Sequence, residues 1–413
     1  MKTEDIYDAI IVGAGPAGLM AAIRAGERGR KVLVLEKNRA AGKKLLLSGK
    51  GRCNITNAAD SVEDFIKNFS VSGVFLRNAL HAFFNKELMI FFAGRGVRLK
   101  TERGGRVFPE SDRAADILAA LLDGAAAAGV SILYGRDITE IKKEGPRFTV
   151  QDGKGGSFNA GSVLITTGGM SYPETGSTGS GFAFAAKFGH TVVAPKPALV
   201  GLVLAKPLLE WQGISLKNVE CSLDVAGKIA AREFGEMLFT HFGVSGPIIL
   251  DISAAAYDAV ASGKKTHISV DFKPALDYHK LESRMIREFE TAQNKNVSTV
   301  MKALLPSKMA GSFPEACGVA ASKKINQVTK EERAALIKGL KAFRAEVKSV
   351  RPLKEAIVTR GGIATKEINP KTMESRLAQG LFFAGEIIDV DAVTGGFNLQ
   401  AAFSTGYVAG EHL

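Results

Sequence analysis

Glycines and one acid near the N-terminus have the types and spacing needed to hold a diphosphate. The pattern G-x-G-x-x-G is formed by Gly13, Ala14, Gly15, Pro16, Ala17 and Gly18, and Glu36 follows 18 residues after the last glycine. The first glycine of such a pattern allows a tight turn, the second lets the backbone approach a pyrophosphate, and the third lets a helix pack on a strand. The N–H groups at the helix start attract phosphates, and the acid can bind ribose hydroxyls. The pattern predicts dinucleotide binding.

A second stretch with unusual chemistry is LLLSGKGRCNITN, residues 45–57. A redox-active disulfide needs two cysteines, and Cys221 and Cys317 lie far from Cys53 in the sequence, which argues against thiol–disulfide exchange. The glycines permit close approach to a cofactor. Lys50 and Arg52 offer positive charge to a cofactor or a substrate, with a surface role as the alternative. Cys53 is interpreted as a packing residue or as a single proton donor.

The elements that must position these residues form a parallel α/β unit. Residues 7–12 and 31–35 are short apolar strands, and residues 16–27 between them have helical spacing. Near the C-terminus a strand over 381–384 leads to a polar loop and a helix that opens at Gly395–Gly396. This return to the sheet favours FAD over NAD. The amides at that helix start would stabilise negative charge on the reduced flavin.

Between these two regions the sequence predicts further elements. Ser111 or Asp112 is expected to cap a helix that runs to about residue 128. The strand VLITTGG, residues 163–169, ends in glycines that suit approach to the cofactor's phosphates. GSTGSG, residues 176–181, could be a second phosphate cradle for NAD(P)H, but it lacks a preceding strand and a following acid. It is therefore interpreted as the entry to a helix.

From about residue 195 to 351 the sequence pattern no longer alternates between apolar strands and helices as it does near the N-terminus. Strand and hairpin patterns come first, and two amphipathic helices, LESRMIREFETAQ and KEERAALIKGLKAF, follow. We expect a small β-barrel or sheet with a helical part, inserted into the dinucleotide-binding domain. The predicted limits are 1–194 with 355–413 for the dinucleotide-binding domain, 195–272 with about 345–354 for the barrel, and 273–344 for the helical subdomain.

The charge is the unusual part of the composition. The 413 residues include 54 Lys and Arg against 42 Asp and Glu, a net charge of +12. Such a field attracts polyanions, including nucleic acid. Eleven cations and four anions lie between Lys323 and Arg360, so this span is a candidate basic face, with an ordinary solvated helix face as the alternative. No signal peptide, membrane span, zinc motif or disulfide framework is evident, which predicts a cytoplasmic protein without a metal.

Five stretches together resemble the BaiN/RdsA-type NAD(P)/FAD-dependent oxidoreductases, also called YhiN-like flavoproteins. They span almost the whole chain: AGKKLLLSGKGRCNITN, GGMSYPETGSTGSGF, GEMLFTHFGVSGPIIL, TRGGIATKEINPKTMESRL and GLFFAGEIIDVDAVTGGFNLQAAFSTGYVAG. The resemblance implies a glutathione-reductase-like FAD-binding Rossmann domain of α/β class, with an inserted β-barrel and a small helical subdomain. Ala401 and Phe403 depart from the aromatic pattern often found after NLQ, which affects ring packing locally.

The resemblance also implies which residues hold FAD. Beyond the first glycine turn and Glu36, they are Lys37, Lys44, Ser48, Gly49, Gly51, Arg52, Cys53, Asn54, Ile138, Thr167, Gly168, Gly169, Gly385, Glu386, Asp389, Gly396, Phe397, Asn398 and Leu399.

Family members share hydride transfer at flavin N5 but differ in substrate, so three hypotheses stay open. The first is reduction of a uridine in ribosomal RNA to dihydrouridine, with Cys53, Tyr172 or His241 as proton donor. The second is a small-molecule enone reductase or an amine (aminoketone) oxidase. The third is a flavin-bearing binding protein without catalysis. NAD(P)H is the expected diffusible reductant.

Overall fold

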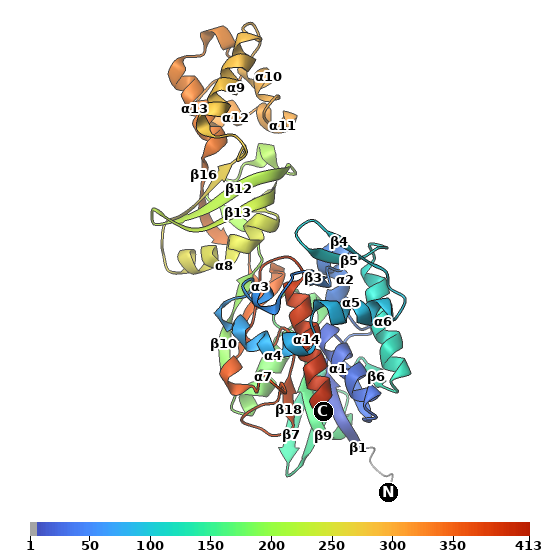
Figure 1. The fold of residues 1–413 in the computed structure, drawn as a ribbon. Helices are drawn as coiled ribbons and strands as arrows, with labels where there is room; N and C mark the ends of the chain where they lie inside the picture. The colour runs from blue at the N-terminus through green and yellow to red at the C-terminus, as the bar shows by residue number, and fades with distance from the viewer. Residues whose placement is uncertain (1–5) are drawn as a thin grey trace. The chain divides into compact units, whose positions relative to one another are not determined.

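The computed structural model describes residues 6–413, which form two compact units (Figure 1). Unit 1 comprises the residues up to Pro197 together with Leu353–Leu413, and unit 2 is Ala198–Pro352. Unit 2 is therefore inserted into unit 1 in the sequence. The predicted separation of a barrel from a helical subdomain inside this insertion stays a prediction.

Unit 1 is built on a seven-stranded sheet of order β6-β2-β1-β9-β8-β7, with β18 also paired to β9. Its strands are β1 Ile6–Val12, β2 Val32–Glu36, β6 Ser131–Tyr134, β7 Ile138–Glu144, β8 Arg147–Asp152, β9 Ser157–Ile165 and β18 Leu381–Phe383. The pairs β1–β2, β1–β9, β2–β6 and β9–β18 are parallel, whereas β7, β8 and β9 pair antiparallel. All five residues of β2, VLVLE, are buried, as expected for a strand covered on both faces.

The carboxyl ends of the central strands are level. Val12 pairs with Leu35 and with Ile165, and Ile165 pairs with Phe383. The loops that follow β1, β2, β9 and β18 therefore leave the sheet at one edge. In parallel α/β sheets this is the edge where ligands bind.

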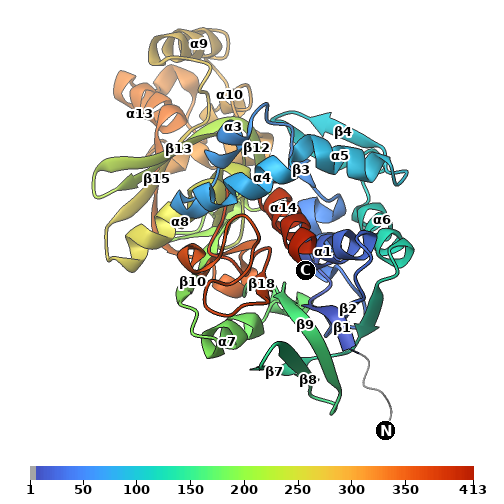
Figure 2. The same ribbon diagram turned by 60° about the horizontal axis from the view of Figure 1, so that its bottom comes forward.

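Helices from the two ends of the chain pack tightly in unit 1. Figures 1 and 2 show α1 (Pro16–Glu27) beside α14 (Phe397–His412). A Cβ on Gly406 would lie 2.3 Å from Ala17 O, and one on Gly410 would lie 2.5 Å from Ala21 O. Glycine at these two positions permits the close approach, so the C-terminal helix holds the first glycine turn in place.

The remaining elements of unit 1 surround this sheet. A three-stranded sheet of order β3-β5-β4 and a two-stranded pair, β10–β17, complete the strands. Their bounds, with those of the helices, are α2 Lys43–Leu47, β3 Thr56–Asn57, α3 Val62–Ile66, α4 Arg77–Ala82, α5 Asn85–Ala93, β4 Leu99–Glu102, β5 Arg106–Pro109, α6 Ala114–Ala127, α7 Ser180–Lys187, β10 Val192–Ala198 and β17 Val358–Ile363.

The predicted cap of α6 is wrong. The N-cap residue is Arg113, and no side chain there accepts a capping hydrogen bond. The carboxylate of Asp112 instead accepts hydrogen bonds from Arg52 and Lys100. The carboxylate of Asp112 therefore forms long-range ion pairs and does not form the cap of α6 that the local sequence pattern predicts.

Unit 2 contains a closed barrel of six antiparallel strands in the order β11-β14-β13-β12-β15-β16. They are β11 Leu202–Leu204, β12 Ser215–Val225, β13 Lys228–Phe239, β14 Gly243–Ser245, β15 Thr266–Asp271 and β16 Phe343–Val350. Burial alternates along β15, so every second side chain points into the barrel. The two-residue turn between β12 and β13 has positive φ at Ala226 and Gly227, as tight hairpins require. The predicted barrel is confirmed.

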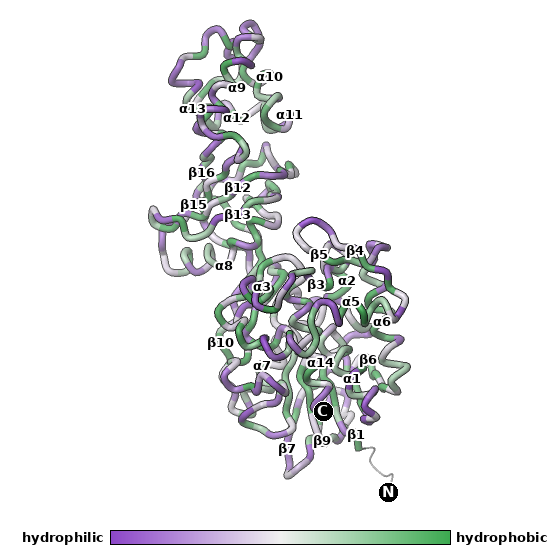
Figure 3. The backbone as a smooth tube through the Cα atoms, viewed as in Figure 1, coloured by the Kyte–Doolittle hydropathy of each residue, from purple (hydrophilic) through white to green (hydrophobic). Residues whose placement is uncertain are grey.

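Helices complete unit 2: α8 Pro247–Ala261, α9 Tyr278–Glu290, α10 Val297–Met301, α11 Ser307–Ala310, α12 Phe313–Ala316 and α13 Lys330–Lys341. The two predicted amphipathic helices correspond to α9 and α13, and Figure 3 shows both hydrophilic and hydrophobic segments in this part of unit 2. Helix α8 is not among the predicted elements, because its apolar start follows strand-like segments. Trp211 is buried against both Phe239 of the barrel and Phe313 of the helices, so they share one core.

Candidate functional site

The first glycine turn connects β1 to α1 at the ligand-binding edge of the sheet. Gly13 has φ +110°, and a Cβ there would lie 2.7 Å from Thr166 O. A Cβ on Gly18 would lie 2.0 Å from Gly13 O. Gly15 differs, because a Cβ there would meet no protein atom within 4 Å, and its φ of −85° suits any residue. The chain itself therefore gives no reason for glycine at position 15, and the room beside it fits a ligand.

Glu36, the last residue of β2, is buried beside this turn. Its Oε2 accepts a hydrogen bond from the N–H of Ala14 at 2.9 Å, and its Oε1 accepts from the backbone N of Asn38 at 2.8 Å and from Asn38 Nδ2 at 2.7 Å. Asn38 Nδ2 also donates to Thr175 O. Asn38 is a site residue that sequence reasoning missed, although its position two residues after the acid is a usable signal. The neighbouring Lys37 donates to Thr178 Oγ1 in an exposed position.

The loop over residues 48–54 has an unusual backbone. Gly49, Lys50, Gly51 and Cys53 all have positive φ. The conformation is uncommon for a side-chain-bearing residue, and the rest of the structure must hold Lys50 and Cys53 in it.

Hydrogen bonds anchor this loop at both of its ends. The backbone N of Cys53 donates to Ser48 O, and the Oγ of Ser48 donates to Leu45 O. At the other end, Asn54 Oδ1 accepts from the backbone N of Val107 on β5. The loop is thus a fixed structure and not a flexible linker.

Arg52 is held by two carboxylates. Its guanidinium donates to Asp112 and to Glu102, and it lies over the ring of Phe108, 4.1 Å from the centroid. The hydrogen bond that Arg52 donates to Glu102 is the main cause that raises the pKa of Arg52. These contacts anchor the loop on β4 and β5. Lys50 is exposed and makes no ion pair with any residue in the range 6–413.

Cys53 lies inside the core of unit 1 and has no exposed surface. Burial raises the pKa of its thiol to about 12. A thiol of this kind keeps its proton at neutral pH and is not a ready nucleophile. The geometry favours packing for this residue.

A polar network joins four segments at the edge of the sheet. Lys44 Nζ on α2 lies 2.6 Å from Glu386 Oε2, in the turn after β18, and 2.6 Å from Ser171 Oγ, in the loop after β9. Ser171 Oγ also donates to Glu386 Oε1 at 2.9 Å, and the backbone N of Thr359 on β17 donates to the same oxygen at 2.8 Å. Lys44 and Glu386, both of which the resemblance assigns to the FAD site, lie in direct contact in this network, and their role in holding FAD stays a prediction. Ser171 and Thr359 are additions that no local pattern marks.

The segment after β9 contains one unsatisfied polar group. The hydroxyl of Thr167 is buried and finds no hydrogen-bond partner within residues 6–413. Gly168 has φ +73°, and a Cβ on Gly169 would lie 2.3 Å from Thr359 Oγ1, so this turn passes close to β17. A Cβ on Gly181, in the second glycine-rich stretch, would lie 2.1 Å from Thr167 Oγ1. That glycine serves packing at the start of α7.

The C-terminal segment closes the same edge. Gly396 has φ +99°, and a Cβ there would lie 2.3 Å from Thr56 O. Asn398 exchanges two hydrogen bonds with the backbone of Ala392, and Phe397 packs edge-on against Phe65. The backbone N of Gly385 donates to Thr405 Oγ1.

Two further predicted FAD-site residues, Asp389 and Ile138, and the variant position Phe403 also lie in unit 1. Burial raises the pKa of Asp389, and Ile138 is buried at the start of β7. At the departure from the family pattern, Phe403 is fully buried against Phe92.

The other two proton-donor candidates lie in different units. Tyr172 directly follows Ser171 in unit 1, is half-buried, and has φ +50°. Burial, followed by the nearby charges of Glu174 and Glu355, raises the pKa of its phenol. His241 is exposed in unit 2, with its ring 5.1 Å from that of Phe242. No helix in residues 6–413 is long and apolar enough to cross a bilayer, and no three metal-ligating side chains gather within that range.

Comparisons with known proteins agree with this architecture. The chain is 31% identical over 403 residues to the 3-dehydro-bile acid delta(4,6)-reductase of Clostridium scindens, with 97% of each chain covered. It is 29% identical over 411 residues to the ribosomal RNA dihydrouridine synthase of Escherichia coli, with 98% of each covered. The synthase of the same name from Haemophilus influenzae is 29% identical over 405 residues, with 96% of each covered.

Two solved structures share the fold. One is the 3-ketosteroid delta1-dehydrogenase of Sterolibacterium denitrificans, with a TM-score of 0.53, 14% identity, and coverage of 98% of this chain and 99% of that one. The other is a flavocytochrome c3 fumarate reductase, with a TM-score of 0.50, 16% identity, and coverage of 99% and 78%. A family model described as HI0933-like protein Rossmann domain matches residues 7–412. The chain therefore belongs to the HI0933-like family and is an FAD-dependent oxidoreductase.

Proposed function

We propose that this protein reduces an activated C=C bond, and that its leading substrate is a uridine of ribosomal RNA, converted to dihydrouridine. Relatives at 29% identity are named for that product, and a relative at 31% identity is named as a bile acid reductase. All three match nearly the whole chain. Whatever the substrate, the proposal requires FAD, and this requirement is supported by the fit of FAD to the carboxyl-end edge of the sheet in unit 1.

Several features of unit 1 fit the two ends of FAD. The N–H groups at the start of α1 and the open space beside Gly15 suit the pyrophosphate, and the carboxylate of Glu36 suits a ribose. The unpartnered hydroxyl of Thr167 and the network around Glu386 suit the ribityl chain. The start of α14 at Gly396 suits the pyrimidine ring of the flavin. When bound and reduced, with NAD(P)H as the proposed electron source, the flavin would supply a hydride to one carbon of the double bond.

The other carbon of the double bond must receive a proton from an acid. Cys53 is a poor choice because it is fully buried and its thiol has a pKa of about 12. The phenol of Tyr172 keeps its proton at neutral pH, since its ordinary pKa is 10.0 and burial raises that pKa further. Its hydroxyl accepts and donates no hydrogen bond within residues 6–413, so it is available to a substrate. We take Tyr172 and His241 as the two donors to test, through Tyr172→Phe and His241→Gln.

One observation carries the choice of RNA over a small molecule, and it is the surplus of unpaired cations on unit 2. The 155 residues of this unit, Ala198–Pro352, contain 22 Lys and Arg against 16 Asp and Glu. Lys323, Lys341 and Arg344 are paired with acids. Lys324, Lys338 and Lys348 are exposed and form no ion pair within residues 6–413. Such cations can neutralise backbone phosphates, which supply much of RNA affinity.

The span from Lys323 to Arg360, predicted as a basic face, is divided between the two units. Lys354 and Arg360 belong to unit 1, whereas the other nine cations of that span belong to unit 2. Within unit 2 they are distributed over the loop before α13, α13 itself, and the strand β16 with the residue that follows it. The proposal therefore relies on the cations of unit 2 alone.

The test is a map of dihydrouridine in ribosomal RNA from wild-type and deletion cells. We expect one dihydrouridine to disappear in the deletion and to return when the gene is restored. A gene encoding Gly15→Ala, which we expect to impair FAD binding, should not restore it. Fully modified ribosomal RNA in the deletion strain would exclude this substrate.

The second candidate function is reduction of a small enone, favoured by the 31% identical bile acid reductase. Oxidation of NAD(P)H that depends on an added steroid enone, with ribosomal RNA unchanged in the deletion, would support it. Hydrogen peroxide produced from an amine under air would instead indicate an oxidase.

A further inference from the structure

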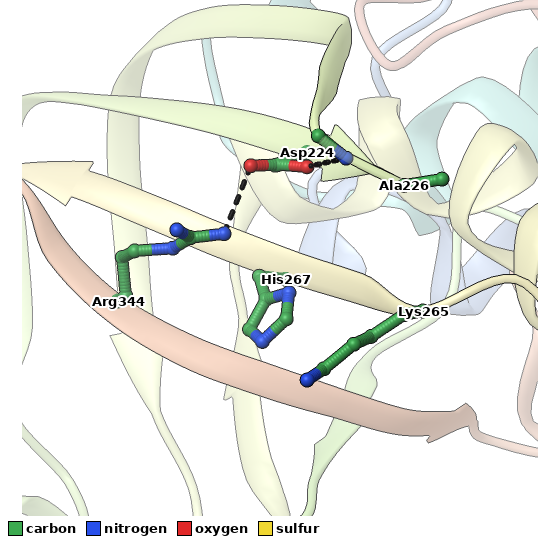
Figure 4. A pocket seen from close by; sticks show the side chains of 6 residues that line it. Asp224, Ala226, Lys265, His267 and Arg344 are labelled. Carbon is green, nitrogen blue, oxygen red and sulfur yellow. Dashed lines mark hydrogen bonds and ion pairs between the residues drawn. The ribbon is translucent and has the colours of Figure 1, made fainter.

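The barrel of unit 2 has a hollow on its surface where β12, β15 and β16 lie side by side. Its volume is about 310 Å³, and it is lined by Asp224, Ala226, Gly227, Lys265, His267 and Arg344. Figure 4 shows the side chains of Lys265, His267 and Arg344 gathered around the same space. The lining holds no large apolar side chain, so the hollow does not suit a steroid or another apolar ligand.

Sheet register explains why these side chains meet. Asp224 pairs with His267 across β12 and β15, so both point to the same face. On β16, Arg344 pairs with Ser269, two residues beyond His267. Lys265 lies just before β15, where its carbonyl accepts the N–H of Ala226 in the hairpin turn. The turn residues Ala226 and Gly227 are small, which leaves the hollow open.

The available hydrogen-bond donors of the hollow are the side chains of Lys265, His267 and Arg344. Within residues 6–413, the side chains of Lys265 and His267 form no hydrogen bond or ion pair. Arg344 donates to Asp224 Oδ2 at 2.9 Å, which fixes its guanidinium, while its side chain stays 55% exposed. The backbone N of Gly227 is already used by Asp224 Oδ1. A guanidinium fixed by one acid still has N–H groups for an oxyanion.

Two acids oppose the cations. Asp224 lies in the lining, and Glu346 is the cross-strand neighbour of His267 on β16. Lys265 and Arg344 balance the carboxylates of Asp224 and Glu346, so the hollow would hold an anion through the directed N–H groups of Lys265, His267 and Arg344 and not through a net positive charge.

We propose that this hollow binds a backbone phosphate of the RNA substrate, a proposal that rests on the RNA function proposed above. Lys265 and Arg344 contact the phosphate oxygens, and His267 donates a further hydrogen bond. The contact is independent of sequence, as phosphate contacts are, and it positions the RNA on the barrel.

The test measures binding of the FAD-loaded full chain to ribosomal RNA purified from deletion cells, over a range of salt concentrations. Lys265→Ala and Arg344→Ala should each weaken binding by about fivefold to tenfold and lower the slope of log Kd against log salt by about 1. Asp224→Asn should act in the opposite direction and tighten binding by about twofold to fivefold, because it removes the carboxylate of the lining. Lys280→Ala, which removes an exposed lysine of α9, is the matched control and should change little.

The opposite signs separate electrostatics from damage to the fold, since damage would weaken binding in all three variants. Unchanged RNA binding in Lys265→Ala and Arg344→Ala, with ribosomal RNA modified by the wild-type protein, overturns the hollow alone. Absence of both binding and modification by the wild-type protein overturns the RNA function as well. A raised KM for NADPH, but not for NADH, in Lys265→Ala would assign the hollow to the nicotinamide cofactor and overturn the proposal.

Discussion

Lys44 and Glu386, which are 342 positions apart, form an ion pair whose Nζ–Oε2 distance is 2.6 Å. The side chains are 25% and 20% exposed, and Ser171 bonds to both. The pair joins α2, from the N-terminal half, to the turn after β18, near the C-terminus. The ion pair therefore connects two parts of the candidate FAD site that are far apart in the sequence.

Breaking this pair should uncouple those two parts. We expect Lys44→Met and Glu386→Gln each to weaken FAD binding by about tenfold, and the double variant to lose less than the sum of the two. The coupling should be about 1 kcal/mol, obtained from FAD titrations of the four proteins. Lys142→Met, which breaks the exposed pair with Glu140 on β7, should change stability little, because solvent screens that pair, and should leave FAD binding unchanged. Strict additivity would show that the pair plays no part in assembling the site.

Gly15 and Gly18 should respond differently to the same methyl group. Gly15→Ala meets no protein atom within 4 Å, so it should lower the free energy of unfolding by about 1 kcal/mol or less and still deplete bound FAD. Gly18→Ala places a Cβ 2.0 Å from Gly13 O, so it should destabilise the fold itself by several times that amount, about 3 kcal/mol or more. Flavin absorbance per protein and chemical unfolding of the apoprotein measure the two effects. A Gly15→Ala protein with full FAD content would remove the argument for the pyrophosphate.

Replacing Cys53 should alter stability and not chemistry. Cys53→Ala leaves a small cavity in the core and should lower the free energy of unfolding by about 1–2 kcal/mol. Turnover at saturating substrate and its pH profile should stay within about twofold, because a thiol with a pKa of about 12 does not titrate near neutrality. Loss of turnover with FAD retained would restore Cys53 as a proton donor.

Buried His190 should make unit 1 less stable in mild acid. Its Nε2 lies 2.7 Å from Ser375 Oγ, and burial, partly offset by Glu367, lowers its pKa from the ordinary value of 6.5. Below that value the unfolded chain takes up a proton that the folded state resists. Stability is therefore fully present above pH 6.5 and falls as the pH drops, by up to about 1.4 kcal/mol per pH unit.

The measurement is the free energy of unfolding of unit 1 between pH 5 and pH 7.5. His190→Gln, which stays neutral and can still bond Ser375, should flatten the profile, whereas His279→Gln, at an exposed position of unit 2, should not. An identical slope in the wild-type and His190→Gln proteins would assign the acid sensitivity to carboxylates such as Glu367.

The sequence by itself determined the elements whose causes are local. The strand–glycine–helix unit could be predicted because apolar runs, helical spacing and glycine stereochemistry act over a few residues. For the same reason, the barrel strands and the amphipathic helices α9 and α13 were predictable, and the family motifs identified the cofactor. The cap of α6 was missed because its acid, Asp112, serves a partner 60 residues away, Arg52.

Only the tertiary structure decided what each polar residue does. Cys53 and Arg52 are neighbours in one motif, yet one is buried in the core and the other is tied to Glu102 and Asp112. Ser171 and Thr359 join the site through contacts with Glu386 that no local pattern encodes. Burial, pairing and pKa depend on which distant segments the folded chain brings together, and such neighbours cannot be predicted from the spacing of residues along the sequence.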